Sequence, residues 1–265
     1  MWKEPLTKFG LVHNVFIVIA VMSIIVGVYF GYKFRGENNA RKRDFIPCVF
    51  AIILIIMEVF KIIFGLCIGY PSTSLIPFQI CSLPMYFLPL LYVFKKGIIK
   101  DILLGFNGYA ITLAGIAYFV NPSAMLQSKY IVLSLHSGIY HAIIIGVCIF
   151  VFVSNNLLGK KGIQKFLKGF ALFVVFTWIA MIANYITHQI NPNSSLNLFY
   201  LYPVETETFP VIDKYVRPNV PYFIYYLSFI ISYFVLSFAP YTFLLIVEII
   251  KNKIQRSDRD EFKEA

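Results

Sequence analysis

The sequence predicts an all-α protein, a polytopic transmembrane bundle of about seven helical spans, on three observations. Hydrophobic residues make up 59% of the 265 residues and charged residues only 14%, whereas soluble domains carry about a quarter charged residues. Several apolar runs reach the roughly 20 residues that a helix needs to cross the hydrocarbon core. The basic residues also alternate between successive connections, as they do in membrane proteins.

Seven apolar runs are expected to form the spans of a single domain, 1–265. They are 11–30, 46–68, 78–94, 98–120, 130–153, 166–190 and 222–250. The first run is too long for a cleaved signal peptide and a basic stretch follows it, so we expect it to stay as a span. The mixed-charge segment 251–265 is expected to be a cytoplasmic tail.

The basic residues behind the net charge of +10 are distributed unevenly among the loops. Loops one, three and five, counted with Lys100 and Lys168 at the starts of the runs that follow loops three and five, and the C-terminal tail hold 17 of the 23 Lys and Arg residues, whereas the N-terminal segment and loops two, four and six hold 5. Because basic loops stay in the cytoplasm, this predicts an outside N-terminus, an inside C-terminus and an odd number of spans. Nucleic acid is not an expected partner, because the sequence has no motif for it.

Polar residues within the predicted spans gather in their outer halves or near the midplane. They are Glu58, Lys61, Gln79, Cys81, Ser82, His136, His141, Asn184 and His188. Polar groups are costly in lipid and usually face the bundle interior. The pattern therefore predicts a polar cavity that opens toward the outer leaflet, with inner halves nearly free of such groups apart from Glu248. The long loop 191–221 is either a lid over this cavity or a linker at the membrane interface.

The segment 78–90, FQICSLPMYFLPL, carries the cysteine with the most reactive setting. Cys81 is either a small buried hydrophobic residue or a nucleophile, since a helix N-terminus favours a thiolate. Pro84 and Pro89 lack an N–H group, so the carbonyls four residues before them are expected to lose their helical partners. The four cysteines have no CxxC spacing, which predicts separate thiols and no zinc site.

The remaining polar side chains each allow a structural and a functional interpretation. His136 and His141 lie about 140° apart around a helix, so they cannot bind one metal together. Ser137 and His141 share a helix face. Glu58 and Lys61 either neutralise each other along one helix or orient a histidine. Asn184 is either a bond between helices or a partner of an imidazole or a substrate carbonyl.

Three short motifs resemble a known family. They are IPFQICSLPMY at 76–86, LSLHSGIYHAIIIG at 133–146 and IANYI at 182–186. Together they resemble the YwaF-type bacterial membrane proteins, which are related to a vertebrate acyltransferase that remodels ether phospholipids and, more distantly, to androgen-induced lipid hydrolases. The resemblance covers most of the chain, from the second span to the seventh. The sequence departs from it at 78–81, where FQIC stands in place of the expected LHLC, so Gln79 replaces a histidine.

The resemblance implies a bacterial plasma-membrane acyltransferase or transacylase that acts on phospholipids or lysophospholipids, without a cofactor or metal. By position it makes Cys81 the nucleophile and His141 the base, with His136 as the alternative match. Supporting or substrate-binding roles fall to His136, Asn184, Gln79, Glu58, Lys61 and Ser82. Hydrolysis of a lipid is a second possible outcome of the same chemistry.

A transporter or lipid-binding protein is the alternative from a different class. Its polar cavity would hold a solute, and the two prolines of the third run would produce the broken helix that such sites use. A retinal protein is disfavoured because the seventh run has no lysine before Lys251.

The charge distribution leads to a first prediction, on topology. In a variant without the native cysteines, Ser194→Cys should react with a membrane-impermeant maleimide added outside intact cells, because loop six is predicted to be extracytoplasmic. Labelling that requires permeabilised cells would show the opposite orientation.

Overall fold

A computed structural model describes residues 10–70, 75–110, 115, 130–194, 196–201, 221–239 and 241–250, without the side chains of Ala110, Tyr200 and Tyr222. Over these residues the regular structure is helical and contains no strand, which confirms the all-α fold class. The second half of the predicted fourth span, most of loop six (202–220) and the predicted tail 251–265 lie outside the described residues.

The helices follow the predicted apolar runs. In chain order they are α1 (Leu11–Lys33), the 3-10 turn η1 (Glu37–Asn39), α2 (Ala40–Cys67), the 3-10 turn η3 (Ile80–Ser82), α3 (Leu83–Val93), α4 (Ile98–Gly105), the π-helical turn η4 (Phe106–Ala110), α7 (Ile131–Ser154), α8 (Lys160–Ile190), the 3-10 turn η5 (Leu198–Tyr200) and α9 (Tyr222–Leu236). Residues 241–250 are again helical.

Five of these segments are long and apolar enough to cross a membrane. Among the described residues they are Leu11–Lys33, Glu37–Cys67, Ile131–Ser154, Lys160–Ile190 and Phe223–Ile250. The third predicted run is shorter than expected, because its helical part is only Ile80–Val93. At 1.5 Å per residue it spans about 20 Å, less than the roughly 30 Å hydrocarbon core.

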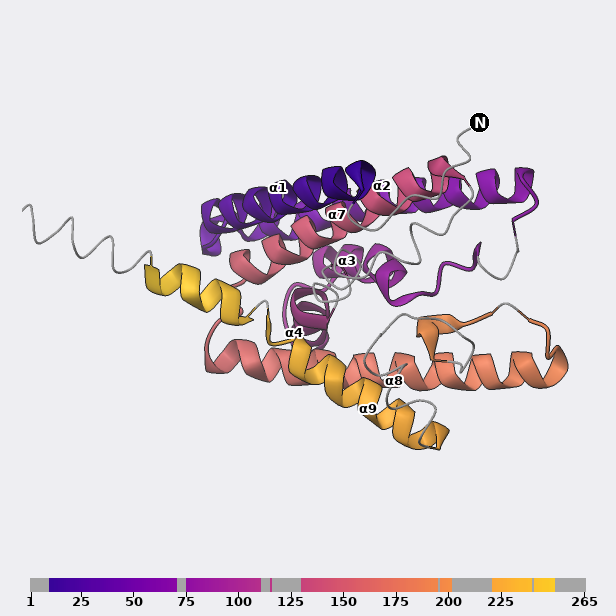
Figure 1. Ribbon diagram of the computed structural model, residues 1–265. Helices are drawn as coiled ribbons and strands as arrows, with labels where there is room; N and C mark the ends of the chain where they lie inside the picture. Colours follow the sequence, from indigo (N-terminus) through magenta and orange to yellow (C-terminus); the bar gives the residue numbers. More distant parts are fainter. Residues whose placement is uncertain are drawn as a thin grey trace, which may run out of the picture.

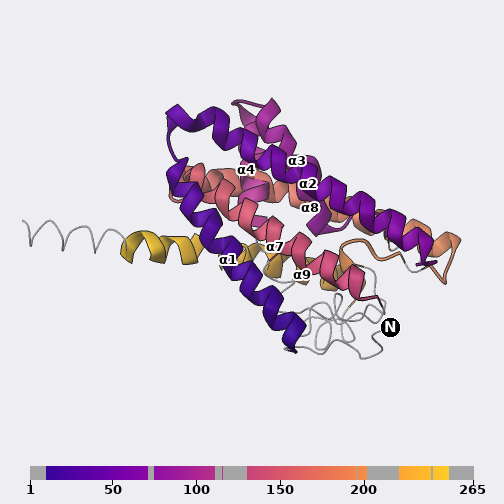
Figure 2. The same cartoon turned by 90° about the horizontal axis from the view of Figure 1, so that it is seen from above.

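The helices form two layers with the short helices between them. Figure 1 shows α1, α2 and α7 together on one side, α8 crossed by α9 on the other, and α3 and α4 in the middle. The second view shows α1 lying alongside α7 and diverging from it toward one end (Figure 2). The closest helix pairings are α1 with α7, α2 with α3, and α4 with α8. The third run therefore lies inside the bundle, against the segment of α2 that carries Glu58.

Close helix approach depends on glycine. A Cβ at Gly27 of α1 would lie 2.4 Å from the carbonyl oxygen of Gly146 on α7, and one at Gly105 would lie 1.8 Å from the carbonyl oxygen of Lys165 on α8. Small residues let backbones approach where the surrounding lipid provides no hydrophobic driving force. The α1–α7 and α4–α8 crossings therefore require these glycines.

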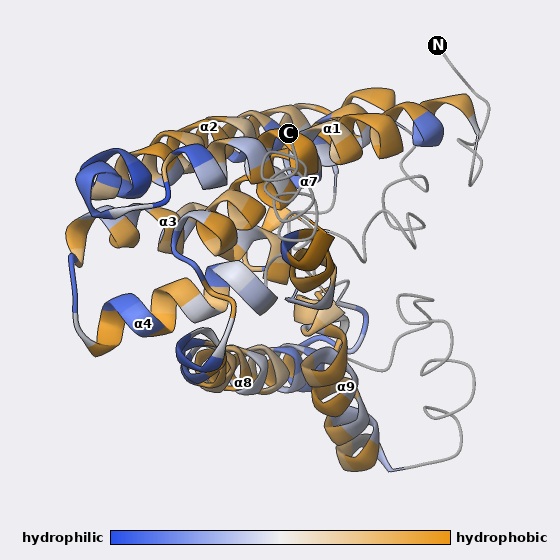
Figure 3. Cartoon of the chain, turned by 90° about the vertical axis from the view of Figure 1, so that its left-hand side faces the viewer, coloured by the Kyte–Doolittle hydropathy of each residue, from blue (hydrophilic) through white to orange (hydrophobic). Residues whose placement is uncertain are grey.

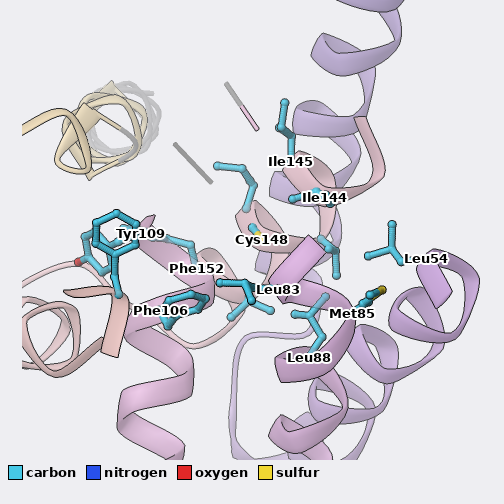
Figure 4. Packing of buried hydrophobic residues seen from close by; sticks show 14 of the residues in the cluster. Leu54, Leu83, Met85, Leu88, Phe106, Tyr109, Ile144, Ile145, Cys148 and Phe152 are labelled. Atoms are coloured by element: carbon cyan, nitrogen blue, oxygen red, sulfur yellow. The ribbon is translucent and has the colours of Figure 1, made fainter. Parts of the chain in front are cut away.

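Larger side chains fill the space between the layers. Figure 4 shows Leu83, Met85 and Leu88 of α3 between Leu54 of α2 and Phe106, and all five are at least 96% buried. Aromatic pairs join α8 to α9: the rings of Phe173 and Tyr233 stack with centroids 4.3 Å apart. The short α3 is thus held in place by packing on several sides.

The loops sort to two ends of the bundle as the charge alternation predicts. Arg35, after α1, contacts Asn156 after α7 and lies 3.6 Å from Glu248. Asp101 of α4 binds Lys168 of α8 at 2.7 Å. Loops one and five and the start of α4 therefore meet at one end, which we call the basic end. Which side of the membrane this end faces stays a prediction.

The expectation of nearly bare inner halves is wrong at the basic end. Lys100 of α4 is 6% exposed and donates to Asp44 of α2 at 2.8 Å and to the Leu91 carbonyl of α3 at 2.5 Å. A charged side chain is costly in apolar surroundings but tolerable with its counter-ion and a further acceptor. This ion pair therefore joins three helices, and a lysine only two residues inside an apolar run is the sequence signal for it.

The outer surface of the helices is apolar. Side chains such as Ile25, Ile56, Ile179 and Ile231 are each 46–63% exposed on four different helices. Hydrophobic colour runs along α1, α2 and α9, whereas hydrophilic colour gathers at the α1–α2 turn, on α4 and at the near end of α8 (Figure 3). Such a surface is stable against lipid tails, so the chain is an integral membrane protein.

The α1–α7 crossing provides a matched pair of substitutions. Gly27→Ala should lower the free energy of unfolding by about 1–3 kcal/mol, because the new methyl group would clash with backbone. Gly146→Ala should cost less, because its Cβ would have its nearest neighbours at 3.1 Å. Both replacements gain the same helix propensity. The difference between their thermal stabilities in detergent therefore measures how closely the α1 and α7 backbones approach at Gly27. Equal stabilities of the two variants would contradict the packing described.

Candidate functional site

Polar side chains from three helices meet around the start of α3. The Glu58 carboxylate and the Lys61 ammonium of α2 form an ion pair. Cys81 of η3 interacts electrostatically with both, and Tyr140 of α7 interacts with Cys81 and Glu58. We call this group, with Ser82, His136 and His141, the polar cluster. The structure thus brings together residues that lie up to 83 positions apart.

Cys81 lies directly before α3 rather than inside it. Ser82 is the N-cap residue of α3 and Pro84 occupies its first turn. The Ile80 carbonyl accepts a hydrogen bond from the Leu83 N–H group. The predicted loss of a partner for the Ile80 carbonyl is therefore wrong, because Pro84 stands where a helix has no N–H partner to lose. Cys81 as a whole residue is half-buried, while Ser82 is 3% exposed.

His136 connects α7 to α2. Its Nε2 lies 2.9 Å from the Met57 carbonyl oxygen. A carbonyl can only accept, so this nitrogen carries the proton. The imidazole also stacks on the Tyr140 ring, with centroids 5.5 Å apart. These contacts give His136 a role in holding the two helices together.

His141 is oriented by its own helix. Its Nδ1 lies 2.7 Å from the Ser137 carbonyl oxygen, so Nδ1 donates and the lone pair is on Nε2. The predicted shared face of Ser137 and His141 is confirmed, but the bond goes to the backbone of Ser137. Fixing one imidazole nitrogen in this way sets the tautomer that a general base needs at the other.

Tyr140 belongs to the polar cluster and was not predicted. The residue is 2% exposed and its hydroxyl is buried. That hydroxyl makes no hydrogen bond of normal geometry to any described residue, although the Ser82 side chain lies near it. The available sequence signal for it is its position directly before the candidate base, His141.

Gln79 and Asn184 hold a different segment. The carboxamide of Asn184 on α8 donates to the Leu198 carbonyl at 2.9 Å and accepts from the Leu198 N–H at 2.8 Å. Gln79 donates to the Asn197 carbonyl at 3.0 Å and accepts from the Phe199 N–H at 2.8 Å. We call the bound segment, residues 196–201, the strap. Both carboxamides act on its backbone.

The strap is buried and strained. His188 lies 2.8 Å from the Leu196 carbonyl, and the Phe199 side chain is fully buried. Phe199 adopts φ 56°, ψ 13°, which is unfavourable for a bulky residue. Its ring stacks on Phe78, just before Gln79. The polar residues of α8 and of 78–79 therefore fix the strap beside the start of α3.

The residue types around the start of α3 set the chemistry that is available there. Among the described residues, no group of three or more His, Cys, Asp or Glu side chains could hold a metal ion. Cys48, Cys67 and Cys148 form no disulfide bond and lie outside the polar cluster as defined. The chemistry available at the cluster is that of a thiol, two imidazoles, a phenol and an ion pair.

These features define a polytopic α-helical membrane protein with a thiol and a histidine in a buried polar cluster. The comparison with protein families identifies the particular family: residues 8–244 match the TMEM164 family, and the chain belongs to it. Neither the curated proteins nor the solved structures contain a match.

The strap contacts lead to a prediction on local stability. Asn184→Ala should speed amide hydrogen exchange at Leu198 and lower the free energy of unfolding by about 1–3 kcal/mol, because it leaves a buried N–H and C=O unpaired. Gln189→Ala removes an exposed carboxamide from the same helix and should change neither. Unchanged exchange at Leu198 in Asn184→Ala would show that the strap is held by packing alone.

Proposed function

We propose that this protein is an integral membrane lipid acyltransferase, with Cys81 as nucleophile and His141 as base. The observation that carries the proposal is the position of a half-buried thiol in a polar cluster where a histidine has its tautomer fixed by a backbone carbonyl. A thiol beside an oriented imidazole is the arrangement used in covalent acyl transfer. Membership of the TMEM164 family supports a membrane protein related to the vertebrate acyltransferase that the motifs resemble.

The first half of the reaction transfers an acyl group to the enzyme. Nε2 of His141 removes the proton from the Cys81 thiol, and the sulfur attacks the carbonyl carbon of a phospholipid ester. A carbon–sulfur bond forms and the bond between that carbon and the glycerol oxygen breaks. The glycerol oxygen takes the proton from His141 and leaves as a lysophospholipid. The product on the enzyme is a thioester of Cys81.

The second half transfers the acyl group to an acceptor. His141 removes the proton from the hydroxyl of a second lysophospholipid, and that oxygen attacks the thioester carbonyl. The carbon–sulfur bond breaks, the sulfur recovers the proton from His141, and a new phospholipid leaves. Water in place of the lysophospholipid gives hydrolysis, so the exclusion of water decides between the two outcomes.

The position of the cluster suits a lipid substrate. The helices it is built on are long and apolar, and Cys81 precedes the start of α3, whereas the other end of α3 is bonded to Lys100. Phospholipid esters lie just beneath the headgroups, and the proposal assigns the start of α3 to that depth in the outer leaflet of the plasma membrane. The Glu58–Lys61 pair and Ser82 then contact the polar part of the lipid.

Solute binding or transport is the second candidate function. It is favoured by the discontinuous helices at the centre of the bundle, namely the short α3 and the π-helical turn η4 beside α4. Broken helices often form transport sites, and π-helical turns are frequent at functional sites. A transport function does not need the Cys81 sulfur, so substitution of Cys81 distinguishes the two candidates.

The acyltransferase proposal predicts a shared loss for Cys81 and His141. Purified protein in phospholipid nanodiscs should gain the mass of one acyl chain, and Cys81→Ala should abolish the adduct. Cys81→Ser should be nearly inactive, because the hydroxyl is a poorer nucleophile at neutral pH. His141→Ala should lower the rate of adduct formation by a similar factor. The double variant should be no slower, since the effects of substituting residues that act as one unit are not additive.

Controls come from the same chain. Cys48→Ala and Cys148→Ala should keep the activity, because the proposed nucleophile is untouched. His136→Gln, which keeps a side-chain N–H for the Met57 carbonyl, should retain more activity than His141→Gln if His141 is the base. Full lipid remodelling by Cys81→Ala would refute the proposal, and so would a wild-type protein that never forms an acyl adduct.

A further inference from the structure

The buried hydroxyl of Tyr140 is a polar group without a hydrogen-bond partner among the residues that the structure describes. It lies in the polar cluster near Cys81 and Ser82 and makes no hydrogen bond of normal geometry to a described residue. Buried tyrosine hydroxyls usually find a partner, because an unpaired one loses the hydrogen bonds that water would provide. Two other buried tyrosines of this chain do so: Tyr109 donates to the Leu157 carbonyl at 2.6 Å, and Tyr226 pairs with Thr177 at 3.0 Å.

The ring of Tyr140 is held firmly. It stacks on His136, which is itself bonded to Met57 of α2, and it contacts the ring of His141 edge to face at 6.0 Å. The residue is 98% buried, so its hydroxyl cannot easily rotate toward solvent or toward a different acceptor. A rigid, unpaired O–H group is a preorganised donor for a group that arrives later.

The surroundings of the Tyr140 hydroxyl indicate the chemistry of the ligand group that would accept its hydrogen bond. Glu58 is already paired with Lys61, so a charged ligand group would find no unpaired counter-ion in this ion pair. The nearby thiol of Cys81 attacks carbonyl carbon in the proposed reaction, and the oxygen of that carbonyl must then lie close to the sulfur. A carbonyl oxygen accepts one hydrogen bond from a phenol and needs it more strongly once it becomes an oxyanion.

We propose that Tyr140 is the oxyanion donor: its hydroxyl donates a hydrogen bond to the carbonyl oxygen of the acyl ester that Cys81 attacks. The inference rests on the proposed acyl transfer and extends it. The carboxamides of Gln79 and Asn184 are engaged elsewhere, because each directs an N–H to a carbonyl of the strap. The donor therefore comes from the same helix as the base, one residue away.

The test compares Tyr140→Phe with the wild type in nanodiscs of 1-palmitoyl-2-oleoyl-phosphatidylcholine. The rate at which the Cys81 acyl adduct forms should fall by a factor on the order of 100, as it does when one oxyanion donor is removed. The thermal unfolding temperature should stay the same or rise, because the substitution removes a buried hydroxyl that has no hydrogen-bond partner among the described residues.

Tyr226→Phe is the matched control. Tyr226 is 1% exposed, but its hydroxyl already pairs with Thr177 on a neighbouring helix. Its loss should lower the unfolding temperature and leave the rate of adduct formation unchanged. The two substitutions remove the same atom, so opposite effects on rate and stability separate a catalytic hydroxyl from a structural one.

A binding measurement gives a readout that a purely structural role would not change. A lipid trifluoromethyl ketone adds to a thiol and generates an oxyanion, whereas the matching ether lipid has no carbonyl oxygen. Tyr140→Phe should weaken binding of the ketone by about the factor lost in rate, and should leave binding of the ether lipid unchanged. Equal weakening of both ligands would contradict the inference.

The outcomes separate this inference from the proposed function. If the wild type forms the Cys81 adduct and Tyr140→Phe forms it equally fast, the oxyanion role is refuted and the acyltransferase stands. If Tyr140→Phe mainly lowers the unfolding temperature, the hydroxyl has a structural partner and the inference also falls. If the wild type forms no adduct, the proposed function and the inference fail together.

Discussion

The cost of an unpaired polar group in apolar surroundings constrains the whole of this structure. Most of the chain is hydrophobic, so each buried polar group must be paired within the protein or with its ligand. At the basic end, Lys100 satisfies this by binding Asp44 and the Leu91 carbonyl, which joins α2, α3 and α4. At the other end, Gln79 and Asn184 satisfy it for the backbone of the strap. These two sets of bonds fix both ends of the short α3.

The fixed position of α3 in turn determines where Cys81 lies. The helix is too short to cross the membrane by itself, so packing on α2 and the bonds at its two ends must hold it. Because Ser82 and Pro84 start the helix, the thiol falls in the turn before it, near the Glu58–Lys61 ion pair on α2. A reactive residue supported by rigid neighbours has the geometric precision that catalysis requires.

The sequence was sufficient for features that depend on local pattern. Apolar runs predicted the long helices closely, and the alternation of basic loops predicted which connections share an end. Features that depend on distant partners were missed. Whether Asn184 faces a substrate or the Leu198 backbone is decided by a loop that returns to α8 from outside the helix. The third span was predicted too long because hydropathy does not distinguish a crossing helix from a short one packed inside the bundle.

The contrast among the buried polar side chains is what distinguishes a candidate site from ordinary stabilising contacts. His136, Asn184 and Gln79 were all predicted as functional residues, and each has a backbone partner that accounts for its presence. Their hydrogen bonds position the helices and the strap. Residues of this kind influence a substrate indirectly, through the segments that they keep in place. Cys81, with its partial exposure, and the hydroxyl of Tyr140, with no bonded partner, are not accounted for in this way. These two groups lie in the polar cluster that also contains His141, whose tautomer is fixed by the Ser137 carbonyl, and this combination is what makes the cluster the candidate site.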